Sequence, residues 1–262
     1  MAQKTDGNIV VDKLLSENPT AYKDAAIAGI KRILGLNITD SIPTNKISSV
    51  KMGTTVATNA LLERKGDRTL LLITEGFGDL LRIGYQNRPL LFDLEIKLPE
   101  LLYAKVIEIQ ERLDSNGKVI KKLDTQKARK ALKEAKQDGI DSVAIAFMHS
   151  YVNSEHENKI AEIAREENFN QISISHKVSP LIKLVGRGDT TVADAYLSPI
   201  LRRYVNQVSE ETKDSKSTKL MFMQSNGGLT DAHLFQGKDA LLSGPAGGVV
   251  SMTETGKQAG YD

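Results

Sequence analysis

The sequence predicts an α/β fold with a largely parallel sheet and one antiparallel hairpin insertion, and three patterns support this prediction. Short apolar runs alternate along the chain with segments whose apolar residues recur at helical spacing, which is typical of βαβ units. The run SVAIAFM, which begins at Ser142, is apolar at almost every position, as expected of a strand that is covered on both faces. Residues 106–123 (VIEIQERLDSNGKVIKKL) instead alternate on both sides of Asn116-Gly117, a two-residue hairpin turn.

The first predicted elements lie near a second turn signal. Asp6-Gly7 is a two-residue turn sequence, and a β-branched strand is predicted from Asn8 to Leu15. Only five residues precede this turn, so we expect the chain to begin inside a sheet whose first strand lies elsewhere, rather than the turn to be used in another way. A helix is predicted over residues 26–34, and Gly35 provides its stop.

The middle of the chain has the order of a parallel sheet. Strands are predicted at residues 47–52, 70–73, 142–148 and 172–175, with helices between them. The helix that follows residue 153 has a capping box, since Ser154 is followed three residues later by Glu157.

The last third of the sequence is mainly helical. A helix is predicted over residues 190–208, in which Ser198-Pro199 marks either a kink or the start of a new helix. A polar loop (KDSKSTK, residues 213–219), a strand over residues 220–223 and a small-residue helix from Ser243 to about Gly260 complete the prediction.

The composition limits the classes of partner. A net charge of +2 provides no field that would attract nucleic acid or an anionic membrane. No apolar run reaches the roughly 18 residues of a membrane-spanning helix. The sequence has no cysteine, and its four histidines lack the spacing of metal ligands, so we predict no metal held by the protein itself. The default location is the cytoplasm.

Polar or glycine residues follow five of the predicted strands, where parallel sheets bind ligands. These clusters are Gly53-Thr54-Thr55, Thr74-Glu75-Gly76, His149-Ser150, Ser175-His176 and residues 224–228. Helix capping explains any single cluster better than ligand contact does. Three glycines at a predicted helix start, Gly244, Gly247 and Gly248, permit either close approach of a nucleotide or tight helix packing.

Several longer segments resemble the hydantoinase/oxoprolinase family, and within it the ATP-dependent 5-oxoprolinases. They are KMGTTVATNALLERKGDRTLLLIT, IGYQNRPLLFDL, SPLIKLVGRGDTTVADAYLSPILRRYV, MQSNGGL and GKDALLSGPAGGVV. Three positions depart from the usual family residues: Gly78 for arginine, Gln110 for an acidic residue and Ser251 for glycine.

The resemblance implies an actin-like, ribonuclease-H-like ATPase fold with two lobes, ATP and Mg²⁺ as cofactors, and a cyclic amide as substrate. It implies hydrolysis of 5-oxo-L-proline to L-glutamate, a reaction of glutathione metabolism. Residues 1–186 would form the first lobe without its first strand. Residues 187–262 would form the helices between the lobes and the start of a truncated second lobe.

The family's two glycine-threonine phosphate turns, of the types GGTFTD and DMGGTSTD, do not occur in this sequence. The resemblance therefore implies an internal fragment that is inactive alone. The predicted nucleotide neighbours are Gly53, Thr54, Thr55, Gly244, Gly247 and Gly248, which would lie beside the cleft or at the hinge. Arg187 and Asp189 are the candidate catalytic residues, with an ion pair that stabilises the lobe as the alternative.

Two other functions stay open. One is an N-methylhydantoinase or an acetone-carboxylase-type subunit of the same family. The other is a non-catalytic remnant or interaction module from a split gene. Possible partners are the remaining half of the enzyme or a hydantoinase B-like subunit.

Overall fold

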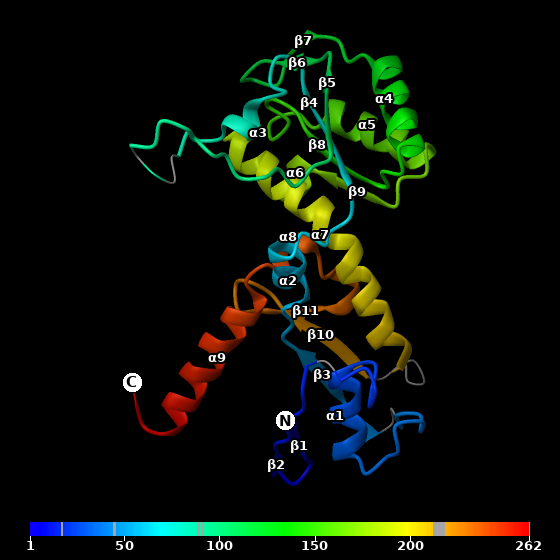
Figure 1. Ribbon diagram of the computed structural model, residues 1–262, viewed down its shortest axis with the longest axis vertical. Helices are drawn as coiled ribbons and strands as arrows, with labels where there is room; N and C mark the ends of the chain where they lie inside the picture. Colours follow the sequence, from blue (N-terminus) through cyan, green and yellow to red (C-terminus); the bar gives the residue numbers. More distant parts are fainter. Residues whose placement is uncertain (17, 44–45, 88–89, 91, 212–217, 262) are drawn as a thin grey trace.

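The computed structural model describes the chain except residues 17, 44–45, 88–89, 91, 212–217 and 262 (Figure 1). Most of the predicted polar loop at 213–219 lies outside the described residues. The strands are β1 (Ala2–Gln3), β2 (Ile9–Val10), β3 (Ser49–Met52), β4 (Thr69–Thr74), β5 (Lys105–Ile109), β6 (Arg112–Leu113), β7 (Val119–Lys121), β8 (Ser142–Ala146), β9 (Gln171–Ile174), β10 (Lys219–Met223) and β11 (Leu229–Asp231). The helices are α1 (Ala25–Ile33), α2 (Val56–Leu62), α3 (Leu80–Ile83), α4 (Thr125–Gln137), α5 (Glu155–Glu166), α6 (Ser175–Val178), α7 (Leu184–Glu211), η2 (Ala232–Leu234), α8 (Gly237–Ala240) and α9 (Ser243–Gln258).

The largest sheet is parallel, as predicted, with strand order β5-β4-β8-β9. Every residue of β4 and β8 is buried, because helices cover both faces of the sheet. On one face the core includes Leu132 of α4 and Ile160 of α5, and on the other it includes Leu81 of α3 and Val192 of α7.

A second sheet, with order β11-β10-β3, lies in the other half of the molecule (Figure 1). Its core combines α1, α2 and the second half of α7 around Phe222 of β10, which stacks on Phe235 with ring centroids 5.0 Å apart. Helix α7 therefore contributes to both cores, and it continues through Pro199, so Ser198-Pro199 does not start a new helix. The division between lobes predicted at residue 186 stays a prediction, and it falls inside α7.

Two sequence predictions need correction at the strand level. Asp6-Gly7 forms a hairpin whose two arms both lie in this chain, because Ala2 pairs with Val10, whereas we expected the first arm elsewhere. Gly7 has φ +84° and the Asp6 carboxylate accepts the Asn8 amide at 2.9 Å, which fixes the turn with only a two-residue arm on each side. Strand β2 is correspondingly shorter than the predicted strand.

The antiparallel hairpin is also shorter than predicted. Only β6 and β7 form it, whereas residues 105–109 belong to the parallel sheet as β5. Strand β5 lies at the edge of that sheet and is mostly half-buried, and such a strand alternates in the same way as a hairpin arm. Within the described residues, no helix is both long and apolar enough to cross a bilayer.

Candidate functional site

Three of the five predicted polar clusters meet at the carboxyl ends of β4, β8 and β9, and Glu157 of α5 connects the ends of β8 and β9. The Glu157 side chain is fully buried. Its carboxylate accepts hydrogen bonds from the Phe147 amide (2.9 Å), the Ser175 hydroxyl (2.5 Å) and the His176 amide (3.1 Å). Nδ1 of His176 lies 2.6 Å from the same carboxylate. Glu157 thus ties the ends of β8 and β9 together.

The sequence predicted that Glu157 forms a capping box with Ser154, but in the structure its carboxylate bonds to the strand ends instead. Ser154 makes no side-chain cap to α5, and its hydroxyl instead accepts a hydrogen bond from the Asn158 side chain at 3.0 Å. Glu157 turns inward because the strand ends present donors that need a buried acceptor. The local sequence pattern carries no signal for this long-range partnership.

Arg187 lies on α7 against the same strand ends and is completely buried. Its Nη1 donates to the hydroxyls of Ser150 and Ser175, the latter at 2.9 Å, and its Nη2 donates to the Phe147 carbonyl at 2.9 Å. The Nε atom is buried and has no hydrogen-bond partner. Burial lowers the pKa of the Arg187 guanidinium, and the nearby Glu157 carboxylate opposes that shift.

A second buried acid and histidine lie at the end of β4. The Glu111 carboxylate accepts from the Thr74 hydroxyl and lies 2.7 Å from Nδ1 of His156. The Thr74 hydroxyl in turn accepts the Met148 amide at 2.8 Å. The carboxyl edge of the sheet is thus a hydrogen-bonded polar layer.

Asp189 follows two residues after Arg187 but lies in a different environment. Its side chain is exposed, and no ion pair joins it to Arg187 within the part of the chain that the structure describes. Desolvation raises the pKa of the Asp189 carboxyl, and the negative charge of Asp189 contributes to raising the pKa of Tyr103, for which burial is the main cause. The structure therefore separates the two candidate catalytic residues, with Arg187 inside the fold and Asp189 at its surface.

Asp189→Asn is expected to raise the melting temperature at neutral pH. Because the folded-state pKa of Asp189 is raised, its contribution to stability is present at low pH and is lost as the pH rises through the folded-state pKa. The difference in melting temperature between variant and wild type, measured by circular dichroism, should therefore shrink as the pH is lowered from neutral through the folded-state pKa of Asp189. An asparagine variant that melts lower at neutral pH would show that the carboxylate makes a favourable contact.

The predicted nucleotide neighbours gather in the other half of the molecule. Gly53 to Thr55 connect β3 to α2, and Thr55 is the N-terminal cap residue of α2 without a side-chain capping bond. The Ser243 hydroxyl at the start of α9 donates to the Thr54 carbonyl at 2.8 Å. A Cβ atom on Gly244 would lie 3.0 Å from Cγ2 of Thr55. The two predicted segments are thus in direct contact.

The glycines of α9 differ in their surroundings. Gly244 permits the close contact with Thr55, which is the packing role that the sequence left open. A Cβ atom on Gly247 would lie 3.8 Å from Cγ of Met223, and one on Gly248 would have no atom within 4 Å. Gly247 and Gly248 therefore leave one side of α9 open beside the β10 end. Within the described residues, no group of three histidine or acidic side chains could hold a metal ion.

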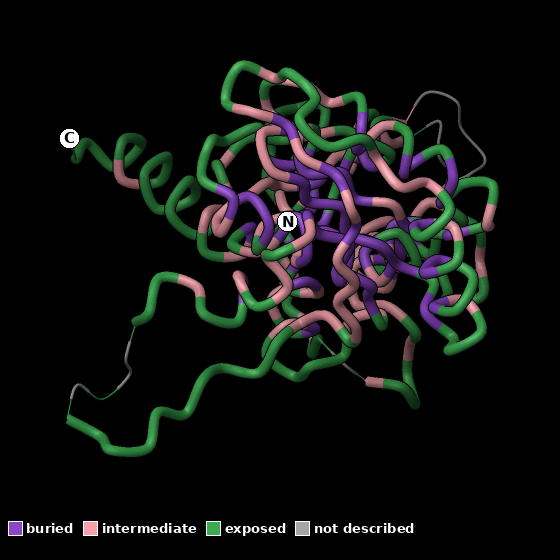
Figure 2. The backbone as a smooth tube through the Cα atoms, turned by 90° about the horizontal axis from the view of Figure 1, so that it is seen from above, coloured by how far each residue is buried: buried purple, intermediate pink, exposed green. Residues whose placement is uncertain are grey.

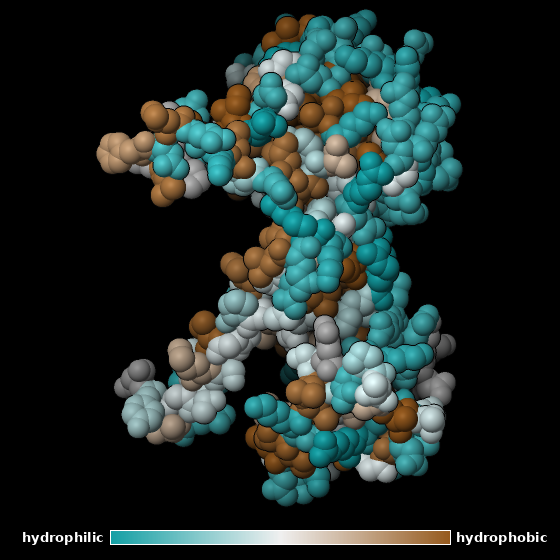
Figure 3. Space-filling model, viewed as in Figure 1, coloured by the Kyte–Doolittle hydropathy of each residue, from teal (hydrophilic) through white to brown (hydrophobic). Residues whose placement is uncertain are grey.

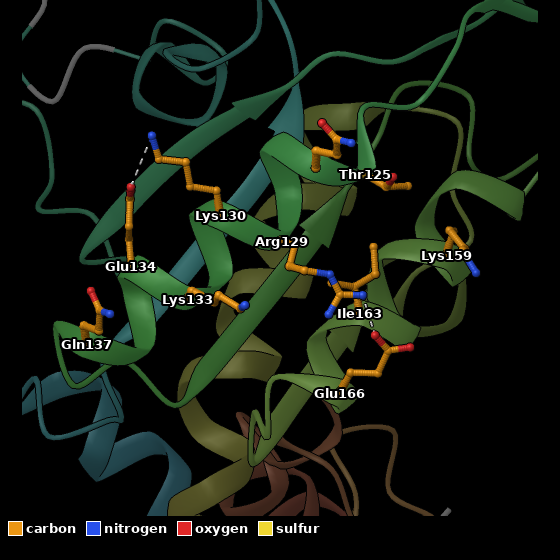
Figure 4. A pocket seen from close by; sticks show the side chains of 10 residues that line it. Thr125, Arg129, Lys130, Lys133, Glu134, Gln137, Lys159, Ile163 and Glu166 are labelled. Carbon is orange, nitrogen blue, oxygen red and sulfur yellow. Dashed lines mark hydrogen bonds and ion pairs between the residues drawn. The ribbon is translucent and has the colours of Figure 1, made fainter.

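Two grooves are present on the described part of the surface. One, of about 440 Å³, lies between α4 and α5 and is lined by paired charges such as Arg129 with Glu166 (Figure 4). The other, of about 420 Å³, lies between β9 and the second half of α7. In it the Asp194 carboxylate already accepts from the hydroxyls of Ser173 (2.6 Å) and Ser198 (3.1 Å). Neither groove includes a predicted site residue.

Comparisons with known proteins identify relatives over nearly the whole chain. Residues 1–168 match the family model described as "Hydantoinase/oxoprolinase N-terminal region", and residues 187–262 match "Hydantoinase/oxoprolinase". The chain is 42% identical to 5-oxoprolinase 1 of Arabidopsis thaliana over 96% of its length and 41% identical to 5-oxoprolinase of Saccharomyces cerevisiae over 94%. In both comparisons it spans 22% of the length of the relative.

Two solved structures share the fold. An ATP-dependent caprolactamase from Pseudomonas jessenii superposes with a TM-score of 0.76 at 28% identity, over 94% of this chain and 37% of that one. A nucleotide-free acetone carboxylase superposes with a TM-score of 0.75 at 22% identity, over 90% of this chain and 36% of that one.

Proposed function

The chain belongs to the hydantoinase/oxoprolinase family, and from this membership we propose that it forms part of an ATP-dependent cyclic amide hydrolase that converts 5-oxo-L-proline to L-glutamate. The observation that carries the proposal is an identity of 41–42% to proteins named 5-oxoprolinase over 94–96% of the chain. A related structure with the same fold is named a caprolactamase, and caprolactam is another lactam, which agrees with a cyclic amide substrate. A carboxylase-type function has weaker support, since the acetophenone carboxylase gamma subunit is 25% identical.

The reaction has a clear chemical requirement. A five-membered lactam is a poor electrophile, and its oxygen is a poor leaving group. Bound ATP would supply a phosphoryl group that makes this oxygen part of a leaving group, and Mg²⁺ would offset the phosphate charge. The protein must then hold the nucleotide and the lactam in line and exclude other nucleophiles.

For the nucleotide, the proposed neighbours are Gly53, Thr54 and Thr55 together with the open side of α9 at Gly247 and Gly248. The contact between Ser243 and Thr54 supports this assignment, because it holds the β3–α2 turn against the first turn of α9. The unpaired amides of the first turn of α9 favour an anion. Gly244 would keep the two segments close. Mg²⁺ would be bound there together with the phosphates of the nucleotide.

For the substrate, the proposed contact is Asp189, and the buried Arg187 is proposed as a residue that supports it. Asp189 is exposed, and its raised pKa gives the carboxyl group a proton affinity above the ordinary range. Arg187 would act from behind the surface: it fixes Ser150 and Ser175 at the strand ends, and its unpartnered Nε is the group left to bind a further acceptor.

We further propose the actin-like fold for the complete protein, a cytoplasmic location, and a hydantoinase B-like polypeptide or region as partner.

A chimaera tests the function directly. Residues 1–262 would replace the matching segment of the Saccharomyces cerevisiae 5-oxoprolinase, and glutamate formation would be measured with ATP, Mg²⁺ and 5-oxoproline. We expect turnover by the chimaera and none by the isolated chain. The Asp189→Asn chimaera should lose at least tenfold in turnover, which corresponds to about 1.4 kcal/mol of transition-state stabilisation.

Two controls make the result decisive. Circular dichroism establishes that each chimaera is folded, and a variant at an exposed residue far from the site, Lys130→Gln, should keep full turnover. A folded chimaera that hydrolyses N-methylhydantoin but not 5-oxoproline would favour the hydantoinase alternative. Glutamate formation by the isolated chain would contradict the expected dependence on other parts of the enzyme.

A further inference from the structure

The groove of about 420 Å³ between β9 and the second half of α7 has no role in the proposed function. Its walls come from both halves of the molecule, since β9 and α6 belong to the parallel-sheet half and η2 belongs to the other half. Figure 3 shows a narrow waist between the halves with hydrophilic residues over much of it, and α7 crosses this waist in Figure 1. We call this feature the waist groove. Its volume is within the range of about 300–1,000 Å³ that is typical of small-molecule sites.

The floor of the waist groove is a chain of buried hydrogen bonds. The Gln171 side-chain amide donates to the Ser173 hydroxyl at 2.9 Å, and that hydroxyl donates to the Asp194 carboxylate at 2.6 Å. Asp194 also accepts from the Ser198 hydroxyl and the Lys238 amide, both at 3.1 Å. All four lining side chains of this chain are more than nine-tenths buried, and Figure 2 shows the buried residues concentrated in the centre of the molecule. The floor is therefore fixed before any ligand arrives.

The same floor holds one cation in position. Nη2 of Arg202 donates to the side-chain oxygen of Gln171 at 2.6 Å, and Nη1 donates to the Asn170 carbonyl at 3.3 Å. Arg202 is exposed, and no ion pair among the described residues includes it. A guanidinium has five N–H donors, so donors remain for a ligand. Because uncharged acceptors orient Arg202, its full positive charge stays available in the groove.

Two further cations line the waist groove from other elements. Arg165 lies at the end of α5 and Lys177 lies on α6, and both are exposed. Neither belongs to an ion pair within the part of the chain that the structure describes. Among the described lining residues Asp194 alone is acidic, and its carboxylate already accepts hydrogen bonds from three donors. The waist groove thus has a net positive charge that comes from three separate helices.

The rest of the lining includes an apolar wall. Its buried side chains are Ile174, Val178, Val205 and Phe235. Such a wall has no favourable contact to offer a hydrated inorganic ion, whereas it packs well against a carbon skeleton. Cations on separate helices around an apolar wall therefore fit an organic molecule that carries more than one negative group.

We propose that the waist groove binds a small organic molecule with two anionic groups, carboxylate or phosphate, in which Arg202 holds one group and Arg165 and Lys177 hold the other. The planar fork of arginine matches both kinds of group. The apolar wall contacts the carbon skeleton between them. Since the lining comes from both halves, a bound ligand connects the halves and raises the melting temperature. This inference does not depend on the proposed enzymatic function, because none of the residues assigned to nucleotide or lactam lines the groove.

Isothermal titration calorimetry of the 262-residue chain at low ionic strength tests the proposal with three probes that share a three-carbon skeleton. Glutarate carries two carboxylates, propane-1,3-bisphosphonate carries two phosphonates as a stable stand-in for phosphate, and glutaramide carries two uncharged amides. We expect at least one of the dianions to bind with a Kd below about 1 mM, and glutaramide not to bind. Binding of only one dianion identifies the anionic group that the groove prefers. Added salt should weaken the binding, because the three cations are exposed.

Two variants test the assigned contacts. Arg202→Gln should weaken dianion binding at least tenfold, because both the charge and its donors are removed. Gln171→Leu keeps every charge in the groove but removes the acceptor that orients Arg202, so it should weaken binding at least threefold. Circular dichroism establishes that each variant is folded, and Arg202→Gln alone still decides the outcome if Gln171→Leu does not fold.

Arg203→Gln is the matched control. Arg203 follows Arg202 on the same helix, but its exposed side chain pairs with Asp67 outside the groove. This variant loses the same charge and should leave the Kd unchanged. The proposal is overturned if neither dianion binds, if binding survives Arg202→Gln, or if Arg203→Gln weakens binding as much as Arg202→Gln does.

Discussion

Arg187→Leu is expected to destabilise the parallel-sheet half of the protein by about 3–5 kcal/mol, the usual cost of removing one member of a buried charged network. Arg187 makes hydrogen bonds to Ser150, Ser175 and the Phe147 carbonyl, and all of its partners are at the strand ends. Leucine would leave these acceptors unsatisfied. It would also remove the cation nearest to the fully buried Glu157 carboxylate, which the Ser175 hydroxyl connects to Arg187.

Urea unfolding followed by circular dichroism measures this effect, and the helix itself supplies a control. Arg203 is on the same helix, but its side chain is 60% exposed where it pairs with Asp67. Arg203→Leu should cost about 0.2–1 kcal/mol, as exposed ion pairs do. If Arg187→Leu costs no more than Arg203→Leu, the buried network does not stabilise the fold.

The double variant Arg187→Leu with Glu157→Gln separates charge from packing. Neutralising the carboxylate removes the uncompensated charge, so the double variant should be more stable than the sum of the two single effects predicts. Additive effects would indicate that the two side chains act independently.

The sequence predicted the parallel sheet because its central strands are covered on both faces. Runs such as SVAIAFM are apolar at almost every position, and β8 is buried throughout. Strands at the edge of a sheet are harder to assign from sequence, because a half-buried strand such as β5 and a hairpin arm show the same alternation of apolar and polar residues. Strand β5 was therefore assigned to the hairpin, although its true partner is β4.

The polar layer was predictable only in part. Parallel strands end at the same edge, so the grouping of Thr74, Ser150 and Ser175 followed from the order of elements. The inward turn of Glu157 did not, since its partners lie 10 to 19 residues away along the chain and its local pattern fits a helix cap equally well.

Gly66→Ala is expected to destabilise the protein by about 3 kcal/mol, at the upper end for overpacking a core position. A Cβ atom on Gly66 would lie 2.1 to 2.5 Å from three ring atoms of Tyr196, and this ring is buried in the core that contains α2 and the second half of α7. The backbone cannot move aside easily, because the next amide, that of Asp67, donates to the Tyr196 carbonyl at 3.0 Å. The glycine thus lets the chain pass α7 on its way from α2 to β4.

A double-mutant cycle monitored by urea unfolding tests this steric cause. In a Tyr196→Ala background, which itself should cost about 3–5 kcal/mol, Gly66→Ala should add little, because the ring is gone. In a Tyr196→Phe background the full cost of Gly66→Ala should remain, since Cε1, Cδ1 and Cζ are the ring atoms in contact and phenylalanine keeps all three. Gly256→Ala, in α9 with no atom within 4 Å of the added carbon, should instead stabilise by about 0.5–1 kcal/mol. Equal costs for Gly66→Ala in the alanine and phenylalanine backgrounds would rule out the ring contact as the reason for this glycine.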